Sequence, residues 1–146
     1  MLPIDHHDFG DIWQTEQVFE RAVTDGWAVD GQPGFVYTTD WSGKPVVRDR
    51  MHWVATEAIS AAAALHTRFG GDQYATWYRT WWDYSATFLL DHEHGSWFHQ
   101  LDAENTPTDT VWPGKPDLYH SLQASLTARL PLWPMLATAV DQTLTS

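Results

Sequence analysis

The sequence has no cysteine, few basic residues and no long apolar run, and each shortage excludes a class of protein. Without cysteine, disulfides, thiolate nucleophiles and cysteine-based zinc sites are excluded. Eight Lys and Arg stand against nineteen Asp and Glu, and the formal net charge of −11 argues against nucleic-acid binding. The longest apolar run, around residues 58–65, is too short for a membrane span. We therefore expect a soluble, cytoplasmic protein that binds neither nucleic acid nor membranes.

Aromatic residues, in contrast, are abundant. The chain of 146 residues holds ten tryptophans, and 14% of its residues are aromatic. Packing inside a core accounts for many of them, because aromatic side chains dominate core burial. Several tryptophans nevertheless fall in expected loops, where flat indole faces can pack on the C–H surfaces of a sugar. The length predicts one domain over residues 1–146.

Hydrophobic spacing predicts a mostly helical chain with short strands in its loops. We expect helices at residues 11–25, 53–69, 73–90, 117–129 and 134–143, with Asp11 and Asp72 as caps of the first and third. Residues 34–39 and 45–48 are typical of a hairpin around a turn at 40–43, and residues 95–101 of a further strand.

The connections between these helices predict their arrangement. The link at residues 69–72 is short, so the helices on either side of it should form an antiparallel pair. The long loops all lie at the other ends of the helices, which gathers their aromatic and ionisable residues at one end of the array. This pattern favours a ring of helical hairpins over a closed four-helix bundle.

Two helix entrances carry the residues of chemical interest. In the segment 114–120, Pro116 suits an early helix position and Asp117 can accept the free N–H groups of the first turn. This predicts that His120 lies about one turn into a helix, facing the space that the preceding loop encloses. The second entrance, at residues 48–53, leads into the helix that contains Glu57. Entrances rich in His, Arg, Lys and Trp are typical of the rim of a sugar site.

Three segments, in order, resemble one protein family. They are residues 50–58 (RMHWVATEA), 91–97 (DHEHGSW) and 114–120 (GKPDLYH), with residues 34–37 (GFVY) ahead of them. Together they resemble the C-terminal part of the N-acylglucosamine 2-epimerase superfamily, in particular its aldose–ketose isomerase branch, which includes mannose and sulfoquinovose isomerases. The resemblance implies an all-α fold, a partial (α/α)6 barrel of antiparallel helical hairpins with short β-hairpin loops at one end.

The resemblance also implies a catalytic residue. His120 matches a histidine that moves a proton between C1 and C2 of an open-chain sugar through an enediol. An imidazole suits this task because it titrates near neutral pH and can both take and return a proton. The family chemistry needs neither a cofactor nor a metal, so we expect none here.

The expected substrate contacts surround that histidine. His52 and Trp53 match positions that pack against the sugar, although His52 stands where relatives often carry a second aromatic residue. His99 and Gln100 match a polar contact to sugar hydroxyls, and Pro116 replaces a glutamine ligand of some relatives. Two more residues complete the set of expected contacts: Arg50 and Glu57. Glu57 can orient a neighbouring base or arginine, and we expect an ion pair with Arg50 or Arg48.

Several alternatives remain open. A 2-epimerase acting on N-acyl amino sugars is the second hypothesis, but such relatives follow Phe-His with Pro-Arg, whereas Ser121 and Leu122 follow His120. A third is a non-catalytic fragment that binds carbohydrate or a partner. A glycoside hydrolase would need two opposed carboxylates, for which Glu57 and Asp117 are weak candidates. His92 and His94 are more typical of a tight turn than of a metal site.

The resemblance leaves part of the site without a counterpart. In the family a second histidine and several Arg, Tyr and Asn ligands come from N-terminal helices, which residues 1–10 do not resemble. The helices expected here would also leave apolar faces open, and such patches normally mark a partner. We therefore expect a monosaccharide substrate together with either a homodimer or a missing N-terminal half.

Overall fold

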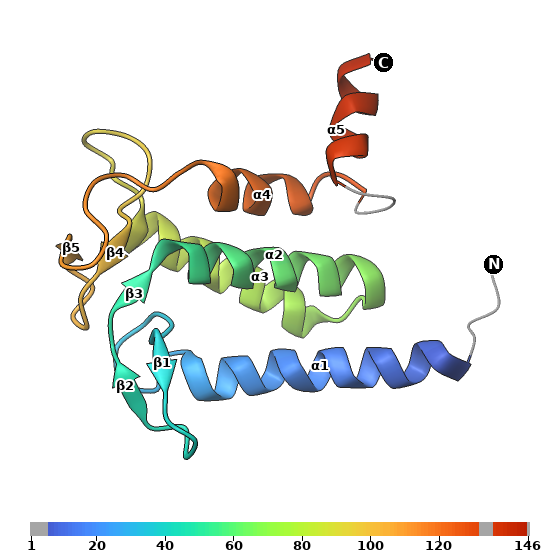
Figure 1. Cartoon of the computed structure of the whole chain (residues 1–146). Coiled ribbons are helices and arrows are strands. Elements are labelled where there is room, and N and C mark those ends of the chain that lie inside the picture. Colours follow the sequence, from blue (N-terminus) through green and yellow to red (C-terminus); the bar gives the residue numbers. More distant parts are fainter. Residues whose placement is uncertain (1–5, 132–135, 146) are drawn as a thin grey trace.

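The helices lie side by side and their connecting loops gather at one end. The computed structural model describes residues 6–131 and 136–145, and side chains over 14–131 and 137–144. Figure 1 shows α1 to α4 as a stack of roughly parallel rods, with all the strands at the same end. The elements, in order, are α1 (His6–Gly26), β1 (Thr38–Thr39), β2 (Pro45–Val47), β3 (Arg50–Met51), α2 (His52–Phe69), α3 (Asp72–Tyr84), a π-helical turn (Ser85–Leu89), β4 (Gln100–Leu101), β5 (Pro107–Thr108), α4 (Tyr119–Thr127) and α5 (Leu136–Thr145).

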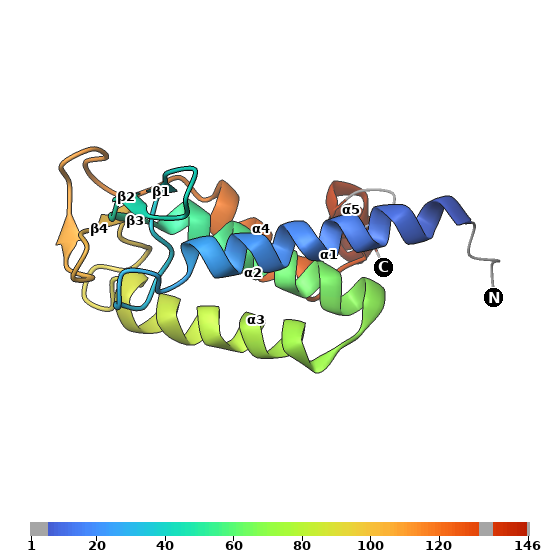
Figure 2. The ribbon, with the colours of Figure 1, turned by 90° about the horizontal axis from the view of Figure 1, so that it is seen from below.

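The central helix is α2, which packs against α3 on one side and α4 on another. Its middle is rich in alanine, the residue with the highest helix propensity. It ends at Gly70, whose φ of 75° is a backbone conformation that residues with a side chain rarely adopt, and whose N–H donates to the carbonyl of His66. The following Gly71 turns the chain directly into α3, so α2 and α3 form the antiparallel pair expected from their short link (Figure 2).

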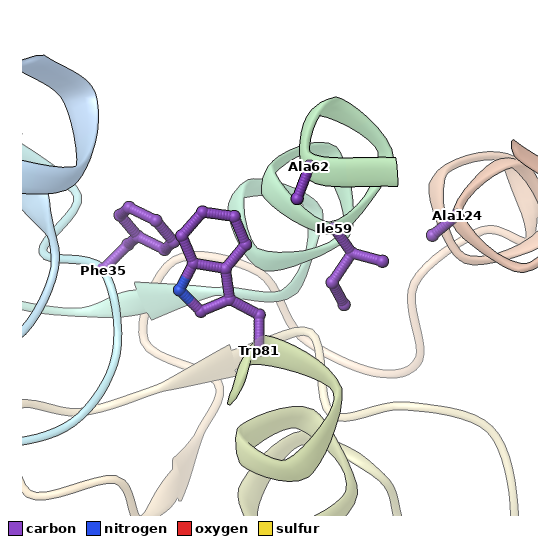
Figure 3. Packing of buried hydrophobic residues seen from close by; sticks show 5 residues of the cluster. All are labelled: Phe35, Ile59, Ala62, Trp81 and Ala124. Atoms are coloured by element: carbon purple, nitrogen blue, oxygen red, sulfur yellow. The ribbon is translucent and has the colours of Figure 1, made fainter. Parts of the chain in front are cut away.

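A core of aromatic and aliphatic side chains joins these helices. Trp81 of α3 is 1% exposed and lies between Phe35, in the loop after α1, and Ile59 of α2. Figure 3 shows these side chains converging, with Ala62 on the same helix as Ile59 and Ala124 reaching in from α4. This cluster therefore ties α2, α3 and α4 to the segment following α1, and a second cluster, built around Tyr84, Leu89 and Leu101, lies toward the strands.

Two small sheets support the loop end. β1 pairs with β2 as an antiparallel hairpin, and β4 lies between β3 and β5 in a second sheet. Gly34 precedes the hairpin with a φ of 111°, and a Cβ there would lie 2.6 Å from the hydroxyl of Tyr84 and 2.9 Å from Nε of Arg50. A glycine is required at this point because both the backbone conformation and the close approach exclude a side chain.

The predicted fold class is confirmed: the chain is mostly helical, with the hairpin loops at one end of a partial (α/α)6 barrel. The five predicted helices and the hairpin at 34–48 are present, although the strands of the hairpin are shorter than predicted. Among residues 6–131 and 136–145, every helix is too short or too polar to cross a lipid bilayer.

Some predicted boundaries and caps of the first and third helices are wrong. α1 begins at His6, so Asp11 lies inside the helix rather than capping it. The side chain of Asp72 makes no capping hydrogen bond, because Asp72 is already the first residue of α3. The α-helix predicted to reach residue 90 ends at Tyr84 and continues as a π-helical turn, in which Leu90 N–H donates to the carbonyl of Ser85.

The last third of the chain also departs from the prediction. Only Gln100–Leu101 of the strand predicted at 95–101 pairs in a sheet, and its partners are β3 and β5, which had been assigned to loops. α4 begins at Tyr119, so Pro116 precedes the helix and His120 is its second residue. Asp117 nevertheless acts as expected at this helix start, since its Oδ1 accepts the N–H of Tyr119 at 2.9 Å.

Candidate functional site

A histidine and a carboxylate from two helices meet at the loop end of the molecule. His120 stands at the start of α4, and Glu57 lies in the second turn of α2. Nδ1 of His120 is 2.7 Å from Oε1 of Glu57, and the two side chains are 28% and 40% exposed. Because a carboxylate accepts the hydrogen bond at Nδ1, that nitrogen carries a proton, and in the neutral imidazole Nε2 then keeps its lone pair. The pair is a base held in one tautomer and open to solvent.

The prediction that Glu57 pairs with Arg48 or Arg50 is wrong. Both arginines bind Asp30, with Arg48 Nε at 3.0 Å and Arg50 Nη2 at 2.8 Å. Burial raises the pKa of Asp30, but hydrogen bonds from the two guanidinium groups outweigh it and hold the pKa below its usual value. Asp30 reaches the arginines because its loop runs beside β3, whereas Glu57 faces α4. Because neither arginine binds Glu57, its carboxylate is available to accept the hydrogen bond from His120.

Arg50, an expected sugar contact, is fully occupied by the protein itself. Its side chain is 1% exposed, and besides Asp30 it donates to the carbonyl oxygens of Pro33 and Arg48. A buried guanidinium is stable only when it is paired in this way. Arg50 therefore ties the loop after α1 to the start of α2, and it has no exposed donor for a sugar.

An exposed aromatic wall borders the imidazole of His120. The ring of Trp53, 36% exposed, lies 6.1 Å from the imidazole, and Tyr37 meets Trp53 edge to face at 6.1 Å. On the other side the ring of Tyr119 lies 4.9 Å from His120. An exposed indole face beside a base can pack on the apolar face of a sugar ring or chain.

Two further histidines lie behind His120. The ring of His52, 2% exposed, contacts the rings of His99 at 5.1 Å and His120 at 6.0 Å, both edge to face. Among the described residues no hydrogen-bond partner reaches either ring nitrogen of His52 or Nδ1 of His99. Burial, with smaller contributions from the neighbouring His99 and His120, lowers the pKa of His52 to about 4. His52 is therefore neutral at physiological pH.

Gln100 organises the loop that precedes α4. The side chain is fully buried, and its amide nitrogen donates to Asp49 at 2.7 Å and to Thr110 at 3.0 Å. Its amide oxygen accepts the backbone N–H groups of Val111 and Trp112. All of its hydrogen-bonding capacity thus goes to the protein, so Gln100 positions the loop instead of offering a free amide to a sugar.

His99 is placed by the same loop. Its ring stacks on that of Trp112, with centroids 5.6 Å apart and planes 25° apart. The N–H of His52 donates to the backbone carbonyl of His99 at 3.1 Å, which joins the two segments. His99 and Trp112 consequently form a second, partly exposed edge of the same site.

Sequence reasoning missed one anchor, the ion pair between Lys115 and Asp91. The ammonium of Lys115 bonds Asp91, which is 8% exposed, and lies 4.8 Å from the centre of the Phe98 ring. The hydrogen bond from Lys115, together with N–H groups of the turn, holds the pKa of Asp91 well below its usual value. Both residues lie in segments that carried the family resemblance, but their mutual contact joins positions 24 residues apart and has no local signal.

The site brings together acid–base groups rather than metal ligands. In the part of the chain that the structure describes, no group of three His, Asp or Glu side chains could hold a metal ion. His94 interacts with Asp91 in an exposed turn that Gly95 closes. What the arrangement can do chemically is move a proton at Nε2 of His120, beside an aromatic surface.

The sequence of the chain is similar to those of known sugar isomerases and epimerases. A family model described as N-acylglucosamine 2-epimerase (GlcNAc 2-epimerase) matches residues 10–124. A D-mannose isomerase from Pseudomonas cannabina pv. alisalensis is 55% identical over 124 residues, and one from Thermobifida fusca is 54% identical over 126 residues. These matches cover 85% and 86% of this chain but only 30% and 31% of the two relatives.

Solved structures share the fold. The crystal structure of a D-mannose isomerase superposes with a TM-score of 0.73 at 25% identity, covering 80% of this chain and 30% of that one. A cellobiose 2-epimerase from Spirochaeta thermophila DSM 6192 superposes with a TM-score of 0.64 at 19% identity, covering 80% and 35%. The chain thus spans about a third of the length of these relatives and solved structures.

Proposed function

The chain belongs to the N-acylglucosamine 2-epimerase family, and from this premise we propose that it supplies part of the active site of a sugar isomerase. The proposed reaction interconverts an aldose and a ketose of the mannose and fructose kind. The relatives named D-mannose isomerase support this choice over an N-acylglucosamine 2-epimerase. We also propose that residues 1–146 form a single domain, the C-terminal portion of an (α/α)6 barrel. The proposed location of the protein is the cytoplasm.

The observation that carries the proposal is the hydrogen bond between His120 and Glu57. With Nδ1 held by the carboxylate at 2.7 Å, Nε2 of His120 is the free base. It removes the proton from C2 of the open-chain aldose, which leaves an enediolate, and the exposed imidazolium exchanges this proton with solvent. Delivery of a proton from the imidazolium to C1, with movement of a proton from O2 to O1, then gives the ketose. Glu57 stabilises the imidazolium during the transfer because its negative charge lies beside the ring.

The surrounding residues have roles of orientation. We propose that Trp53 packs against the apolar face of the sugar, and that His99 contributes a hydrogen bond from the opposite edge. His52 stays neutral behind His120 and can donate one hydrogen bond without adding charge to the site. Arg50 and Gln100 are assigned to holding the loops, because their polar atoms are already engaged.

The proposed reaction needs more than this chain holds. When the carbonyl moves from C1 to C2, a proton must also pass between the two oxygen atoms, which requires a second acid–base group. The chain spans about 30% of the D-mannose isomerases it matches. We propose that further polypeptide supplies this group, either the remaining part of a barrel or a second copy of the chain.

An NMR assay tests the proposal. The protein tested is a fusion of this chain with the part of a D-mannose isomerase that it does not match. Mannose, glucose, fructose and N-acetylmannosamine are each incubated with this fusion in D₂O. We expect mannose and fructose to interconvert, with deuterium entering C2 of the mannose formed. Conversion of N-acetylmannosamine alone would instead indicate an epimerase, and sugar binding without any turnover a non-catalytic fragment.

A further inference from the structure

Trp112 is an exposed tryptophan to which the sequence motifs assign no role. It lies in the segment between β5 and α4, which Figure 1 shows in orange running along the loop end to the start of α4. The residue is 48% exposed, and its indole stacks on the imidazole of His99, with centroids 5.6 Å apart and planes 25° apart. Among residues 14–131 and 137–144, no second ring contacts Trp112. The exposed area of the indole therefore lies away from His99.

The backbone around Trp112 is held from both sides. The amide oxygen of the fully buried Gln100 accepts the N–H groups of Val111 at 3.1 Å and Trp112 at 3.3 Å. A few residues further on, the ion pair of Lys115 with Asp91 ties the chain to the turn after α3. Holding an exposed indole in one place contributes little to the core, but it reduces the entropy that is lost when a ligand packs on that indole.

Trp112 ends a row of rings that begins at the proposed base. The imidazole of His52 contacts those of His120 at 6.0 Å and His99 at 5.1 Å, and Trp112 follows through its stacking on His99. Trp53, in contrast, contacts His120 directly at 6.1 Å. Two imidazoles thus separate Trp112 from the base. A sugar whose reacting carbons lie at His120 would meet Trp53 near these carbons and Trp112 only at its far end.

We propose that Trp112 is a specificity-determining residue, which packs on the end of the sugar farthest from C1 and C2 and selects an aldohexose over an aldopentose. This inference rests on the proposed function, in which His120 acts at C1 and C2. In a hexose the terminal hydroxymethyl carbon and the C–H groups beside it give that end an apolar surface, on which an indole face packs. A pentose lacks this carbon, so it loses the contact with the indole.

Trp41 provides a matched comparison. It lies at the tip of the β1–β2 hairpin, is fully exposed, and contacts no aromatic ring in the described part of the chain. If Trp112 served only to pack against the polypeptide that completes the barrel, its removal would lower stability without changing which sugar is bound. A change in the preference between two sugars is therefore the result that separates a substrate contact from a structural one.

Binding of two polyols that cannot react tests this inference apart from catalysis. Mannitol has the carbon chain of an open hexose, arabinitol is the same molecule without one terminal carbon, and neither has a carbonyl group to isomerise. The protein is the fusion of this chain with the rest of a D-mannose isomerase, labelled with fluorotryptophan. Fluorine NMR measures the dissociation constants for the parent fusion and for Trp112→Ala, Trp112→Phe and Trp41→Ala. Circular dichroism and urea unfolding check the folding of each variant.

The parent fusion should bind mannitol about tenfold more tightly than arabinitol, the effect of removing one carbon from a fitted contact. Trp112→Ala should weaken mannitol binding about tenfold and arabinitol binding by less than about twofold, so that the preference disappears. Trp112→Phe should keep most of the preference because it keeps an aromatic face, and Trp41→Ala should change neither constant. Mannitol should also shift the resonance of Trp112, identified by its absence from Trp112→Phe, and leave that of Trp41 in place.

An unchanged preference in Trp112→Ala would overturn the proposal, and so would equal weakening of both polyols or a parent fusion that does not bind mannitol. Unfolding of both Trp112 variants would assign the residue a structural role and overturn it as well. Turnover of mannose is scored separately. A fusion in which Trp112 sets the preference but which converts no sugar keeps this inference and removes the proposed isomerase, whereas an active fusion whose preference is indifferent to Trp112→Ala does the reverse.

Discussion

The loop end of the molecule and the flank of α2 differ in how far their side chains are satisfied by the chain itself. At the loop end, the side chains of Arg50 and Gln100 are buried and every polar group they carry is bonded within the chain. Along the flank, the face of α2 that includes Ala58 and Ala61 borders an apolar groove that no side chain of residues 14–131 or 137–144 fills. The polar groups at the loop end are satisfied within the chain, whereas the flank of this partial barrel exposes apolar side chains.

This difference separates two requirements of the proposed enzyme. The position of His120 depends on Glu57 and on the loop held by Gln100 and Lys115, all of which this chain contains. In the proposed enzyme the second acid–base group and the remaining walls of the sugar site come from polypeptide outside this chain. We therefore expect substitutions at the loop end to change chemistry and local order, and substitutions in the groove to change assembly.

The largest expected effect comes from removing the base. In the fusion with the rest of a D-mannose isomerase, His120→Asn should lower kcat by roughly 10²–10⁴-fold, the usual contribution of general acid–base catalysis. Folding should be intact, because the side chain is 28% exposed and fills no core cavity. Circular dichroism and urea unfolding serve as the control. Near-normal turnover, or a loss explained by unfolding, would show that His120 is not the base.

A second prediction concerns the buried His52. Its pKa of about 4 lies below the value of 6.5 for an unfolded chain, so between these pH values the unfolded state binds a proton that the folded state does not. Stability should therefore fall as the pH drops from 6.5 to 4, by up to roughly 3 kcal/mol, and be restored above pH 6.5. Asp117, His99 and His120 are the titratable neighbours that contribute to this shift.

The variant His52→Phe should remove this part of the pH dependence while leaving the ring contacts in place. Urea unfolding at pH 7.5 and pH 4.5 measures it, with His94→Phe, at an exposed side chain, as the matched control. A pH dependence identical in His52→Phe and the parent chain would mean that His52 is accessible to protons in the folded state.

The third prediction separates orientation from catalysis. Glu57→Gln keeps the size of the side chain but removes its charge, so His120 loses its fixed tautomer and the stabilisation of its imidazolium. We expect kcat in the fusion to fall about tenfold to a hundredfold, less than for His120→Asn, with little change in KM. Glu104→Gln, on an exposed turn, is the control. A rise in KM at constant kcat would identify Glu57 as a sugar contact instead.

The smallest effect is expected for the loop anchor. Lys115→Met breaks the ion pair with Asp91, and because the lysine side chain is 40% exposed the cost to global stability should be below about 1 kcal/mol. The visible result should be faster amide exchange over residues 110–118, without a change over α3. Unchanged exchange in that loop would mean that Gln100 alone holds it.

The sequence predicted the helices well because their signals are local. Alanine-rich spacing in α2 and glycines after Phe69 indicate a helix and its end without knowledge of the rest of the fold. The family motifs likewise located His120, Glu57 and Trp53, which the structure brings together. The prediction that they form a sugar site stays a prediction, as does the homodimer.

Pairings between distant residues could not be predicted in this way. Asp30, in the loop after α1, pairs with both Arg48 and Arg50, either of which had been predicted to pair with Glu57, and this outcome depends on how two loops pack. β3 and β5 are two residues long and have no periodicity to detect, so their pairing with β4 follows only from the tertiary fold. The π-helical turn after Tyr84 has no such signal either.

The most direct test of the central claim converts fructose to mannose in D₂O and measures by NMR how much deuterium enters C2 of the mannose. The isolated chain and the fusion are compared. The account predicts incorporation by the fusion, its loss in the fusion carrying His120→Asn, and weak or no incorporation by the isolated chain. Full turnover by the isolated chain would contradict the claim that its site is incomplete. Conversion by the fusion without deuterium at C2 would contradict proton transfer by His120.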